Sequence, residues 1–302
     1  MKNLEIKKLS LEFKDNLKIN YDIKKKNWFN IGGKTKLFFK AENLIELKNF
    51  IKKINNEKKI FVLGAGSNTL FTDETYDGVV IKLSKNFNNI SKLSEEIIVA
   101  GSAVTDKALS DFAMENNLSG FEFLSCIPGT VGGGIKMNAG CFGSEFKDIL
   151  LSVQAINKNG QIITIPSNKI IFKYRNNNLS HDLIFLSASF KGKKSNKASI
   201  QSLMKKYKEQ KETSQPTKIK TSGSTFKNPI TQTDKKVWEL IKQSIPLNTS
   251  FGDARISDKH CNFFVNKGNA SFKDMKNLIK FVSNKVLENT GITIETEIKI
   301  IE

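Results

Sequence analysis

A glycine-rich segment near the middle of the chain constrains the fold more than any other feature of the sequence. In Ile127-Pro128-Gly129-Thr130-Val131-Gly132-Gly133-Gly134, four of the six positions from 129 to 134 are glycine. A glycine inside a helix or strand costs about 0.5–1 kcal/mol relative to alanine, so the fold must gain something from the run. The usual gain is a backbone that approaches a ligand closely. Asn138 and Gly140 extend this stretch of small residues, and we expect the whole stretch to contact a ligand, with a purely structural role as the alternative.

A second segment of small residues follows a short apolar run. Ile60-Phe61-Val62-Leu63 predicts a buried strand, and it leads directly into Gly64-Ala65-Gly66-Ser67-Asn68. Small residues there let backbone N–H groups approach a phosphate, and Ser67 and Asn68 can add donors. The segment lacks the Lys-Ser/Thr pair of a P-loop and the third glycine of a dinucleotide-binding fingerprint. A phosphate-binding loop and an ordinary turn both remain open.

Apolar periodicity predicts helices and strands in an irregular order. The predicted helices span residues 44–54, 105–117, 203–211, 237–241 and 271–290, and the predicted strands span residues 60–63, 79–82, 96–100, 151–156, 161–165, 183–190 and 292–300. Lys158-Asn159-Gly160 predicts a hairpin turn. Ser271 with Asp274 predicts the start of the last helix, and Gly291 predicts its end. This order is typical of α+β domains rather than of a doubly wound sheet.

The charge of the chain is strongly positive. Its 48 Lys and Arg residues against 30 Asp and Glu give a formal net charge of +18. A charge of this size raises the question of nucleic-acid binding. The lysines are spread along the whole chain together with Asn and Ile, which indicates a compositional bias rather than a binding patch. We therefore expect no nucleic-acid partner, and the charge could instead help to attract an anionic small ligand.

The sequence also disfavours membrane insertion, secretion and a metal site. No apolar run approaches the roughly 18–20 residues of a membrane span, and the first residues are polar, without the apolar core of a secretion signal. A cytoplasmic location is expected. An odd number of cysteines does not suggest a disulfide framework, and the cysteines and histidines have no metal-binding spacing. They are Cys126, Cys141, Cys261, His181 and His260.

Arginine is rare in this chain. Of the 48 basic residues only Arg175 and Arg255 are arginine. Where lysine is used almost everywhere, an arginine that remains is a candidate for a role that needs the planar, bidentate guanidinium group. Tyr174-Arg175 and Asp253-Ala254-Arg255 are therefore kept as candidate functional residues, with chance as the alternative.

The last third of the chain holds three further candidate segments. Thr221-Ser222-Gly223-Ser224-Thr225-Phe226-Lys227-Asn228-Pro229 gathers hydroxyls, a cation and an amide, and a hydroxyl held among such groups could deliver a proton or could cap a turn. In His260-Cys261-Asn262-Phe263 the histidine by itself is more typical of a packing residue. Glu295 and Glu297 share one face of the predicted C-terminal strand, which faces either a site or solvent.

Taken in order, these segments resemble the UDP-N-acetylenolpyruvoylglucosamine reductase family. The resemblance extends from about residue 29 to residue 299, nearly the whole chain, and the Ile-Pro-Gly-Thr-Val-Gly-Gly and Gly-Ser-Thr-Phe-Lys-Asn-Pro strings are its most specific parts. The matching segments are Phe29–Gly33, Leu63–Asn68, Ile127–Gly134, Met137–Gly140, Tyr174-Arg175, Gly223–Pro229, His260–Phe263 and Glu295–Glu297.

The resemblance implies an α+β architecture with two FAD-binding subdomains, similar to the vanillyl-alcohol-oxidase or PCMH fold, with FAD held between them. A smaller α+β substrate-binding domain follows. The expected boundaries are residues 1–85 and 86–205 for the two subdomains and 206–302 for the last domain, whose C-terminal strand would return toward the active site. The family uses NADPH as hydride donor and reduces UDP-N-acetylglucosamine enolpyruvate to UDP-N-acetylmuramate, a peptidoglycan precursor.

The resemblance also implies roles for individual residues. The segments Gly64–Asn68 and Ile127–Thr130, with Gly132, Gly133, Asn138 and Gly140, would bind FAD. Arg175 would hold and polarise the substrate carboxylate, Ser224 would be the general acid, and Glu297 would help to stabilise the intermediate. The substrate would also contact Tyr174, Lys227, Asn228 and His260. No protein partner is implied.

The chain departs from the family pattern at one cation and one loop. Ser244-Ile245-Pro246-Leu247-Asn248 has Leu247 where many relatives carry a lysine or arginine, and Lys242 or the general positive field is the candidate replacement. The short segment between Arg175 and Gln215 matches the branch without an extra substrate-covering loop. Three alternatives remain: a basic nucleic-acid-binding protein, a flavin oxidase acting on another substrate, and a family member that binds flavin without turnover.

Overall fold

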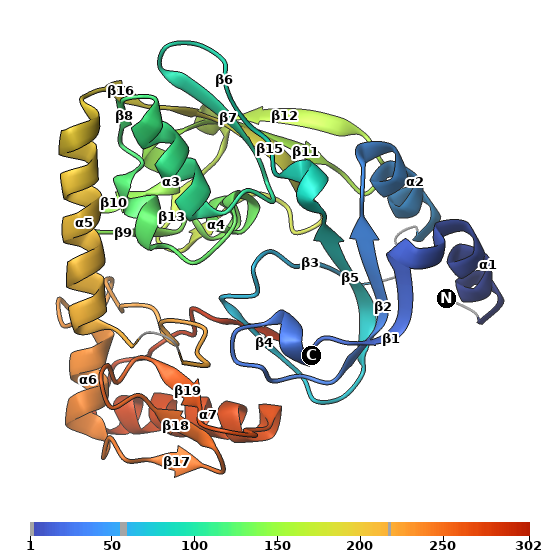
Figure 1. The fold of residues 1–302 in the computed structure, drawn as a ribbon. Helices are drawn as coiled ribbons and strands as arrows, with labels where there is room; N and C mark the ends of the chain where they lie inside the picture. The colour runs from blue at the N-terminus through green and yellow to red at the C-terminus, as the bar shows by residue number, and fades with distance from the viewer. Residues whose placement is uncertain (1–2, 55–58, 217–218) are drawn as a thin grey trace. The chain divides into compact units, whose positions relative to one another are not determined.

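The computed structural model describes residues 3–54, 59–216 and 219–302, which contain both helices and strands, as the α+β prediction requires (Figure 1). The helices are α1 (Asn3–Phe13), α2 (Leu44–Ile54), α3 (Asp106–Glu115), α4 (Val131–Met137), α5 (Lys197–Ser214), α6 (Val237–Ser244) and α7 (Phe272–Thr290). The predicted helix over residues 44–54 is confirmed. The helix predicted over residues 203–211 is longer than expected, since α5 begins at Lys197.

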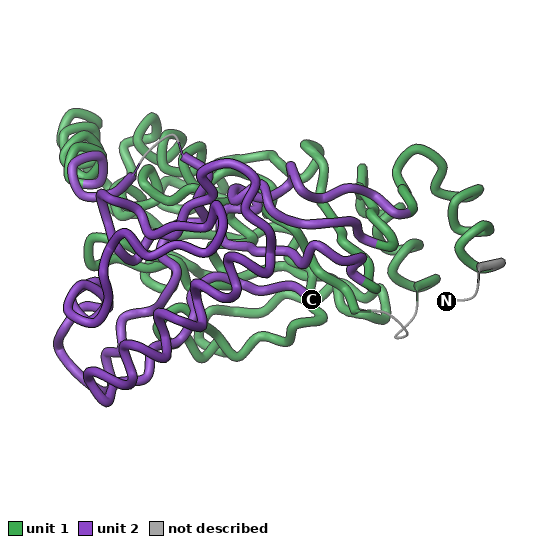
Figure 2. The backbone as a smooth tube through the Cα atoms, turned by 90° about the horizontal axis from the view of Figure 1, so that it is seen from below, with its two compact units in different colours: residues 1–19, 36–65, 77–210 green, residues 20–35, 66–76, 211–302 purple. Residues whose placement is uncertain are grey.

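The chain forms two compact units, and both are built from separate stretches of sequence (Figure 2). Unit 1 comprises Met1–Ile19, Lys36–Ala65 and Asp77–Gln210. Unit 2 comprises Asn20–Thr35, Gly66–Tyr76 and Lys211–Glu302. The boundaries expected near residues 85 and 205 stay a prediction.

A four-stranded sheet, most of which lies in unit 1, carries the first predicted strand. Its order is β1 (Leu17–Asp22), β2 (Lys34–Ala41), β5 (Tyr76–Leu83) and β3 (Lys59–Val62). β3 and β5 are parallel, with Val62 opposite Ile81. Phe39 of β2 stacks on Phe50 of α2 with ring centroids 3.8 Å apart, and both rings are buried in the core beside this sheet. The buried face of α2 therefore packs against the sheet that leads into Gly64–Asn68.

An antiparallel five-stranded sheet forms the rest of the unit 1 framework. Its order is β12 (Ile162–Pro166), β11 (Leu150–Ile156), β15 (Ile184–Lys191), β7 (Ile97–Gly101) and β6 (Ile90–Lys92). The predicted hairpin is confirmed, because β11 pairs with β12 and Gly160 has a φ of 75°. α4 contacts β7 and β15. Three short pairs complete the unit: β8 (Leu118–Ser119) with β16 (Lys193–Lys194), β9 (Gly140–Cys141) with β10 (Ser144–Glu145), and β13 (Phe172–Lys173) with β14 (Asn176–Asn177).

In unit 2, α7 packs against a small antiparallel sheet and also contacts α6 (Figure 1). The sheet order is β17 (Ser250–Phe251), β18 (Ala254–Ile256) and β19 (Phe264–Asn266), and β4 (Thr69–Phe71) runs parallel to β20 (Lys299–Ile301). The predicted ends of the last helix are confirmed. The Ser271 hydroxyl accepts a hydrogen bond from the Asp274 N–H, and Gly291 is left-handed with a φ of 71°.

The strand predicted over residues 292–300 is wrong for most of its length. β20 covers only Lys299–Ile301, and upstream of it a single bridge joins Thr296 to Phe226. Ile294 and Ile298 are nonetheless buried. The alternation of apolar and polar residues therefore reflects alternating burial along an extended segment. Such burial does not require continuous hydrogen-bonded pairing with another strand.

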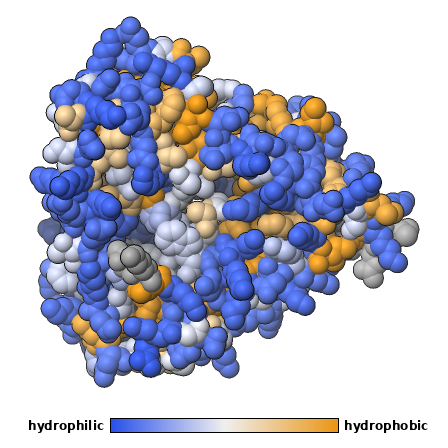
Figure 3. Space-filling view, in the orientation of Figure 1, coloured by the Kyte–Doolittle hydropathy of each residue, from blue (hydrophilic) through white to orange (hydrophobic). Residues whose placement is uncertain are grey.

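The surface seen in Figure 3 is dominated by hydrophilic residues, with apolar side chains in small separate groups. None of the described helices is both long enough and apolar enough to cross a lipid bilayer.

Candidate active site

The segment Gly64–Asn68 presents a row of backbone donors. Across residues 3–54, 59–216 and 219–302, no protein group accepts a hydrogen bond from the backbone N–H groups of this segment. Gly66 has a φ of 71°, and a Cβ at this position would overlap the carbonyl group of Lys26. The turn therefore requires glycine and leaves its N–H groups available to an anion.

The two glycine-bearing segments meet in unit 1. A Cβ built on Gly64 would lie 2.7 Å from Oγ1 of Thr130. The ammonium group of Lys82 donates a hydrogen bond to the Gly64 carbonyl oxygen at 2.6 Å. Two predicted site segments thus touch, and Lys82, which the sequence did not single out, touches one of them.

Three of the four glycines in the central run are needed for packing inside the protein. A Cβ on Gly129 would overlap the carboxyl group of Asp106, and one on Gly134 would overlap the buried Phe146 ring. A Cβ on Gly132 would lie 3.0 Å from Cβ of Ser102. Only Gly133 is open, with Oγ1 of Thr130 as its nearest neighbour at 3.6 Å. The structural explanation, which the sequence left as the alternative, accounts for most of the run.

Asp106 is an unusual acid beside this run. Its side chain is fully buried at the start of α3, and neither carboxyl oxygen has a hydrogen-bond partner in the described part of the chain. Burial raises the pKa of this carboxyl well above its ordinary value. Burial thus disfavours the ionised form of this acid beside Gly129.

Arg175 is held in a defined orientation in unit 1. Its backbone is left-handed, with a φ of 54°. Nη2 donates to the carbonyl of Gly140 at 2.7 Å, Nη1 lies 4.0 Å from Oε1 of Glu145, and the guanidinium carbon lies 5.0 Å from the Tyr174 ring centroid. Strained backbone that is retained at a charged residue is typical of functional sites. The Tyr174-Arg175 and Gly140 segments, predicted separately, are therefore in contact.

The side chain of Asn138 forms hydrogen bonds with other protein groups. It is fully buried and left-handed at the C-terminal cap of α4. Its amide donates to Oε2 of Glu145 at 3.0 Å and to the carbonyl of Lys173 at 3.2 Å. Asn138 thus connects α4 to the segment that carries Arg175, and a direct contact with cofactor stays a prediction.

In unit 2 the Ser224 segment is held by the side chain of Asn262. The Asn262 amide donates to the carbonyl of Phe226 at 2.9 Å, and its Oδ1 accepts from the Phe226 N–H at 3.0 Å. The Asn262 carbonyl also accepts from the Thr225 N–H at 2.7 Å. No described residue forms a hydrogen bond with the half-buried hydroxyl of Ser224. The backbone of Ser224 is fixed while its hydroxyl remains available.

The segment with Glu295 and Glu297 lies beside the Ser224 segment. The Glu297 N–H donates to Thr225 at 2.8 Å, and the Asn68 amide donates to the Glu297 carbonyl at 3.1 Å. Lys227 forms an ion pair with Glu295 at 3.0 Å. The Glu295 side chain is 74% exposed, whereas Glu297 is half-buried. The two carboxylates, expected to act alike, are therefore in different environments.

Other predicted residues of unit 2 have local contacts. The Nδ1 atom of His260 accepts from the Asn262 N–H at 3.2 Å, so Nε2 carries the proton of the neutral ring. Burial lowers the pKa of His260 below its ordinary value. Asn228 accepts from the Val237 N–H at 2.9 Å at the start of α6, and Arg255 is exposed on β18. Contacts of His260, Asn228 and Lys227 with substrate stay predictions.

Comparison with known proteins decides the family. Residues 215–301 match the model of the UDP-N-acetylenolpyruvoylglucosamine reductase C-terminal domain, and residues 35–166 match an FAD binding domain. A UDP-N-acetylenolpyruvoylglucosamine reductase of Pelagibacter ubique is 63% identical over 298 residues, which cover 99% of each chain. The chain belongs to the UDP-N-acetylenolpyruvoylglucosamine reductase family. It is a flavin-dependent oxidoreductase.

Other family members support the same assignment over almost the full length. The reductase of Rickettsia typhi is 43% identical over 286 residues, covering 95% of this chain and 96% of the relative. The crystal structure of the Thermus caldophilus reductase has a TM-score of 0.81 at 29% identity, and it covers 95% of this chain and 98% of that chain. The expected α+β fold, with an FAD-binding domain followed by a second domain, is confirmed.

The residues around Gly64 fit an FAD molecule. A diphosphate requires several hydrogen-bond donors at close range, and the unsatisfied N–H groups of Gly64–Asn68 are such a set. Gly133 adds backbone at which an added Cβ would meet only Oγ1 of Thr130, at 3.6 Å. These segments would hold the cofactor by their backbone, as the sequence predicted.

Proposed function

We propose that this protein reduces UDP-N-acetylglucosamine enolpyruvate to UDP-N-acetylmuramate in the synthesis of peptidoglycan precursors, with NADPH as the hydride donor and in the cytoplasm. Family membership supports the reaction class. The observation that carries the residue assignment is the pairing in unit 2 of the Ser224 segment with the Glu297 segment. Their backbones are joined between Thr225 and Glu297 at 2.8 Å.

Ser224 is proposed as the proton donor. When bound, FAD supplies the hydride chemistry, in which NADPH is oxidised and the enolpyruvyl double bond is reduced. The double bond gains one hydride and one proton, and the proton must come from the protein or from water. The Ser224 hydroxyl has no partner among the described residues, and Asn262 fixes its backbone. It is therefore placed to donate to a ligand rather than to the protein.

Arg175 and Glu297 are proposed to stabilise charge during this step. The contacts of Arg175 with Gly140 and Tyr174 hold its guanidinium group in one orientation, which suits recognition of a planar carboxylate. Glu297 would assist the enol-like intermediate. Tyr174, Lys227, Asn228 and His260 are proposed as further substrate contacts, and Lys242 as a replacement for the family cation at position 247.

Separate measurement of the two half-reactions tests the role of Ser224. In Ser224→Ala, flavin reduction by NADPH should keep its rate under anaerobic conditions, whereas reoxidation by the enolpyruvyl sugar should slow by roughly 10²–10⁴-fold. Ser222→Ala is the matched control, since this neighbouring hydroxyl is buried and donates to the Thr69 carbonyl at 3.2 Å. Equal losses in both half-reactions, or an unchanged reoxidation rate, would show that Ser224 is not the acid.

A further inference from the structure

Arg175 is held by two facing residues of one hairpin. Gly140 of β9 and Glu145 of β10 lie opposite each other in the strand pair. Nη2 of Arg175 donates to the Gly140 carbonyl at 2.7 Å, and Nη1 lies 4.0 Å from Oε1 of Glu145. A Cβ built on Gly140 would lie 2.7 Å from Cγ of Glu145, so the glutamate side chain lies against this glycine. The open end of the hairpin therefore presents a carbonyl oxygen and a carboxylate to the guanidinium group.

The Glu145 carboxylate is itself fixed in place. Its Oε2 accepts a hydrogen bond from the Asn138 amide at 3.0 Å and lies 2.7 Å from Nζ of Lys147. The side chain also accepts from the Asp148 N–H, and the Asp148 carboxylate accepts from the Glu145 N–H at 2.8 Å. Only 19% of the Glu145 side chain is exposed, and charges that are partly removed from water interact more strongly. A carboxylate held in this way can fix the orientation of the cation beside it.

The turn of the same hairpin is anchored by a strained aromatic residue. Phe142 and Gly143 both have a positive φ, of 54° and 82°, which is the combination that a type I′ turn requires. A bulky residue rarely adopts this conformation. The Phe142 ring stacks on Tyr207 of α5, with centroids 4.3 Å apart and an angle of 6° between the ring planes. The stack ties the turn to α5, so the hairpin that contacts Arg175 is held at both ends.

We propose that Glu145 is a positioning residue for Arg175. It keeps the guanidinium group in the orientation in which Arg175 binds the substrate carboxylate, and this assignment rests on the role proposed for Arg175. The Gly140 carbonyl binds Nη2 and Glu145 attracts Nη1, so the two contacts limit rotation of the planar group. The Glu145 charge has the same sign as the substrate carboxylate and opposes its binding. Glu145 therefore favours orientation and disfavours affinity.

Glu145→Gln tests the assignment, because it keeps the size of the side chain and an acceptor for Asn138 but removes the charge. Reoxidation of the reduced flavin by UDP-N-acetylglucosamine enolpyruvate should slow by roughly 10- to 100-fold, as expected for a misoriented group at the reacting centre. The dissociation constant of the oxidised protein for this sugar, measured by calorimetry, should stay unchanged or fall, since a repelling charge is lost. Flavin reduction by NADPH should keep its rate. A merely structural defect would instead weaken binding and slow both half-reactions, and this result would overturn the proposal.

The same substitution in Arg175→Lys shows whether Glu145 acts through Arg175. A lysine has no planar group to orient. In this background Glu145→Gln should change the reoxidation rate by no more than about twofold, although it has a large effect in the wild type. An equal loss in both backgrounds would overturn the proposal.

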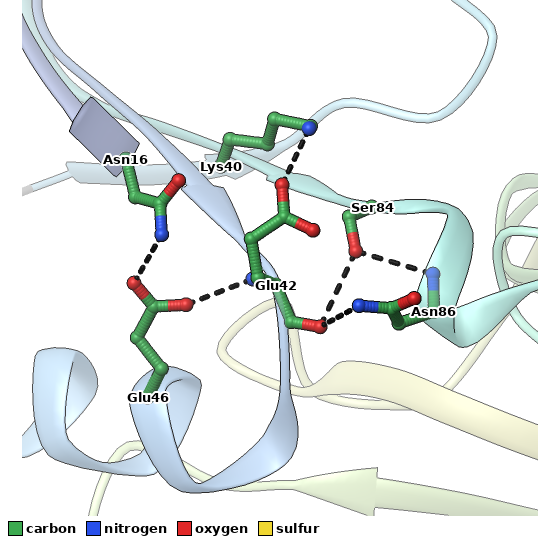
Figure 4. Close-up of polar contacts among 6 residues, drawn as sticks. All are labelled: Asn16, Lys40, Glu42, Glu46, Ser84 and Asn86. Carbon is green, nitrogen blue, oxygen red and sulfur yellow. Dashed lines mark hydrogen bonds and ion pairs between the residues drawn. The ribbon is translucent and has the colours of Figure 1, made fainter.

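Glu46→Gln is the matched control. Glu46 of α2 is also a half-buried carboxylate of unit 1 that accepts from an asparagine amide, that of Asn16 at 2.7 Å, and it accepts from the Glu42 N–H at 2.9 Å (Figure 4). Its substitution should leave both half-reactions and sugar affinity unchanged. An unchanged reoxidation rate in Glu145→Gln, or a loss matched by Glu46→Gln, would overturn the positioning role alone. Failure of the sugar to reoxidise the wild-type flavin would instead overturn the proposed function, and the positioning role with it.

Discussion

The glycine run Ile127–Gly134 in unit 1 and the Ser224 segment in unit 2 are held in place by opposite means. In the first, side chains are absent so that neighbouring groups can approach, as the positions of Asp106 and Phe146 against Gly129 and Gly134 show. In the second, the Asn262 side chain takes the place of a backbone partner. It forms hydrogen bonds with both the N–H and the carbonyl group of Phe226. Added atoms should therefore destabilise the glycine run, whereas removal of the Asn262 amide should destabilise the Ser224 segment.

Sequence segments that look like ligand-binding segments can therefore arise for two different structural reasons. One is close packing around glycines, and the other is the need to satisfy buried backbone polar groups. Most glycines of this run serve the packing of the protein, since only Gly133 is open to a further contact. In the Ser224 segment some hydroxyls are engaged within the protein, as Thr221 is with the Phe264 carbonyl at 2.7 Å, whereas no described residue forms a hydrogen bond with the half-buried hydroxyl of Ser224. The two regions should therefore respond differently to substitution.

Removal of the Asn262 amide should have the largest effect on stability. Asn262→Ala leaves the N–H and carbonyl groups of buried Phe226 without partners, and each such loss costs about 1–3 kcal/mol. We expect the free energy of unfolding, measured by denaturant titration, to fall by about 2–6 kcal/mol. Asn289→Ala is the control, because this exposed amide donates only to the Ser244 carbonyl. A loss no greater than that of the control would contradict the proposed support of the Ser224 segment.

Addition of a methyl group to two neighbouring glycines sharpens the comparison. Gly134→Ala drives Cβ into the buried Phe146 ring and should destabilise the protein by about 1–3 kcal/mol. Gly133→Ala meets only Thr130 and should leave the free energy of unfolding unchanged or slightly higher, while it weakens FAD binding. Denaturant titration and flavin fluorescence separate the two effects. If both variants lost stability equally, the assignment of packing and ligand roles within the run would be wrong.

The buried acid Asp106 should make stability depend on pH. The folded protein retains a proton on this carboxyl that the unfolded chain has released, because burial raises its folded pKa. The contribution of Asp106 therefore becomes unfavourable as pH rises above the unfolded pKa near 4, at about 1.4 kcal/mol per pH unit until the folded pKa is reached. Asp106→Asn removes this titration, so its stability relative to the wild type should increase with pH. A difference that stays constant from pH 4 to pH 8 would show that the carboxyl titrates normally.

The smallest effect is expected at the exposed carboxylate of the C-terminal segment. Glu295→Gln breaks an ion pair with Lys227 in which the Glu295 side chain is 74% exposed, and it should change the free energy of unfolding by about 0.5 kcal/mol or less. Its turnover should remain near that of the wild type, whereas Glu297→Gln should slow flavin reoxidation. Steady-state and anaerobic kinetics of both variants check this contrast. Equal turnover in the two would remove the reason for assigning the catalytic role to Glu297.

Much of the fold could be predicted from local patterns. Helical apolar spacing predicted α2, and the Ser271 and Asp274 pair with Gly291 predicted both ends of α7. The alternating residues from 292 to 300 led to a wrong prediction of a continuous strand. Alternation reflects burial of the side chains, whereas the hydrogen bonds of a strand depend on a partner strand that is distant in sequence. The composition of the two units from interleaved stretches has no local signal at all.

Short strings were enough to nominate candidate site segments such as Gly64–Asn68 and Tyr174-Arg175, whose ligand contacts stay predictions. What the strings could not reveal was which atoms each residue would meet. Asn262 binds Phe226, which is 36 positions away, and Lys82 reaches Gly64 only because two parallel strands end together. Asn138 was expected to bind FAD, and its side-chain amide donates to Glu145 and to the Lys173 carbonyl within the protein. Such contacts follow from tertiary packing, which a single sequence does not display.

The visible spectrum of the purified protein under anaerobic conditions tests the account most directly. Spectra are recorded before NADPH, after NADPH, and after addition of UDP-N-acetylglucosamine enolpyruvate. The account predicts flavin bands that bleach with NADPH and return with the enolpyruvyl sugar. Bands that bleach but return only when oxygen is admitted would contradict it and would identify a flavin enzyme acting on a different substrate.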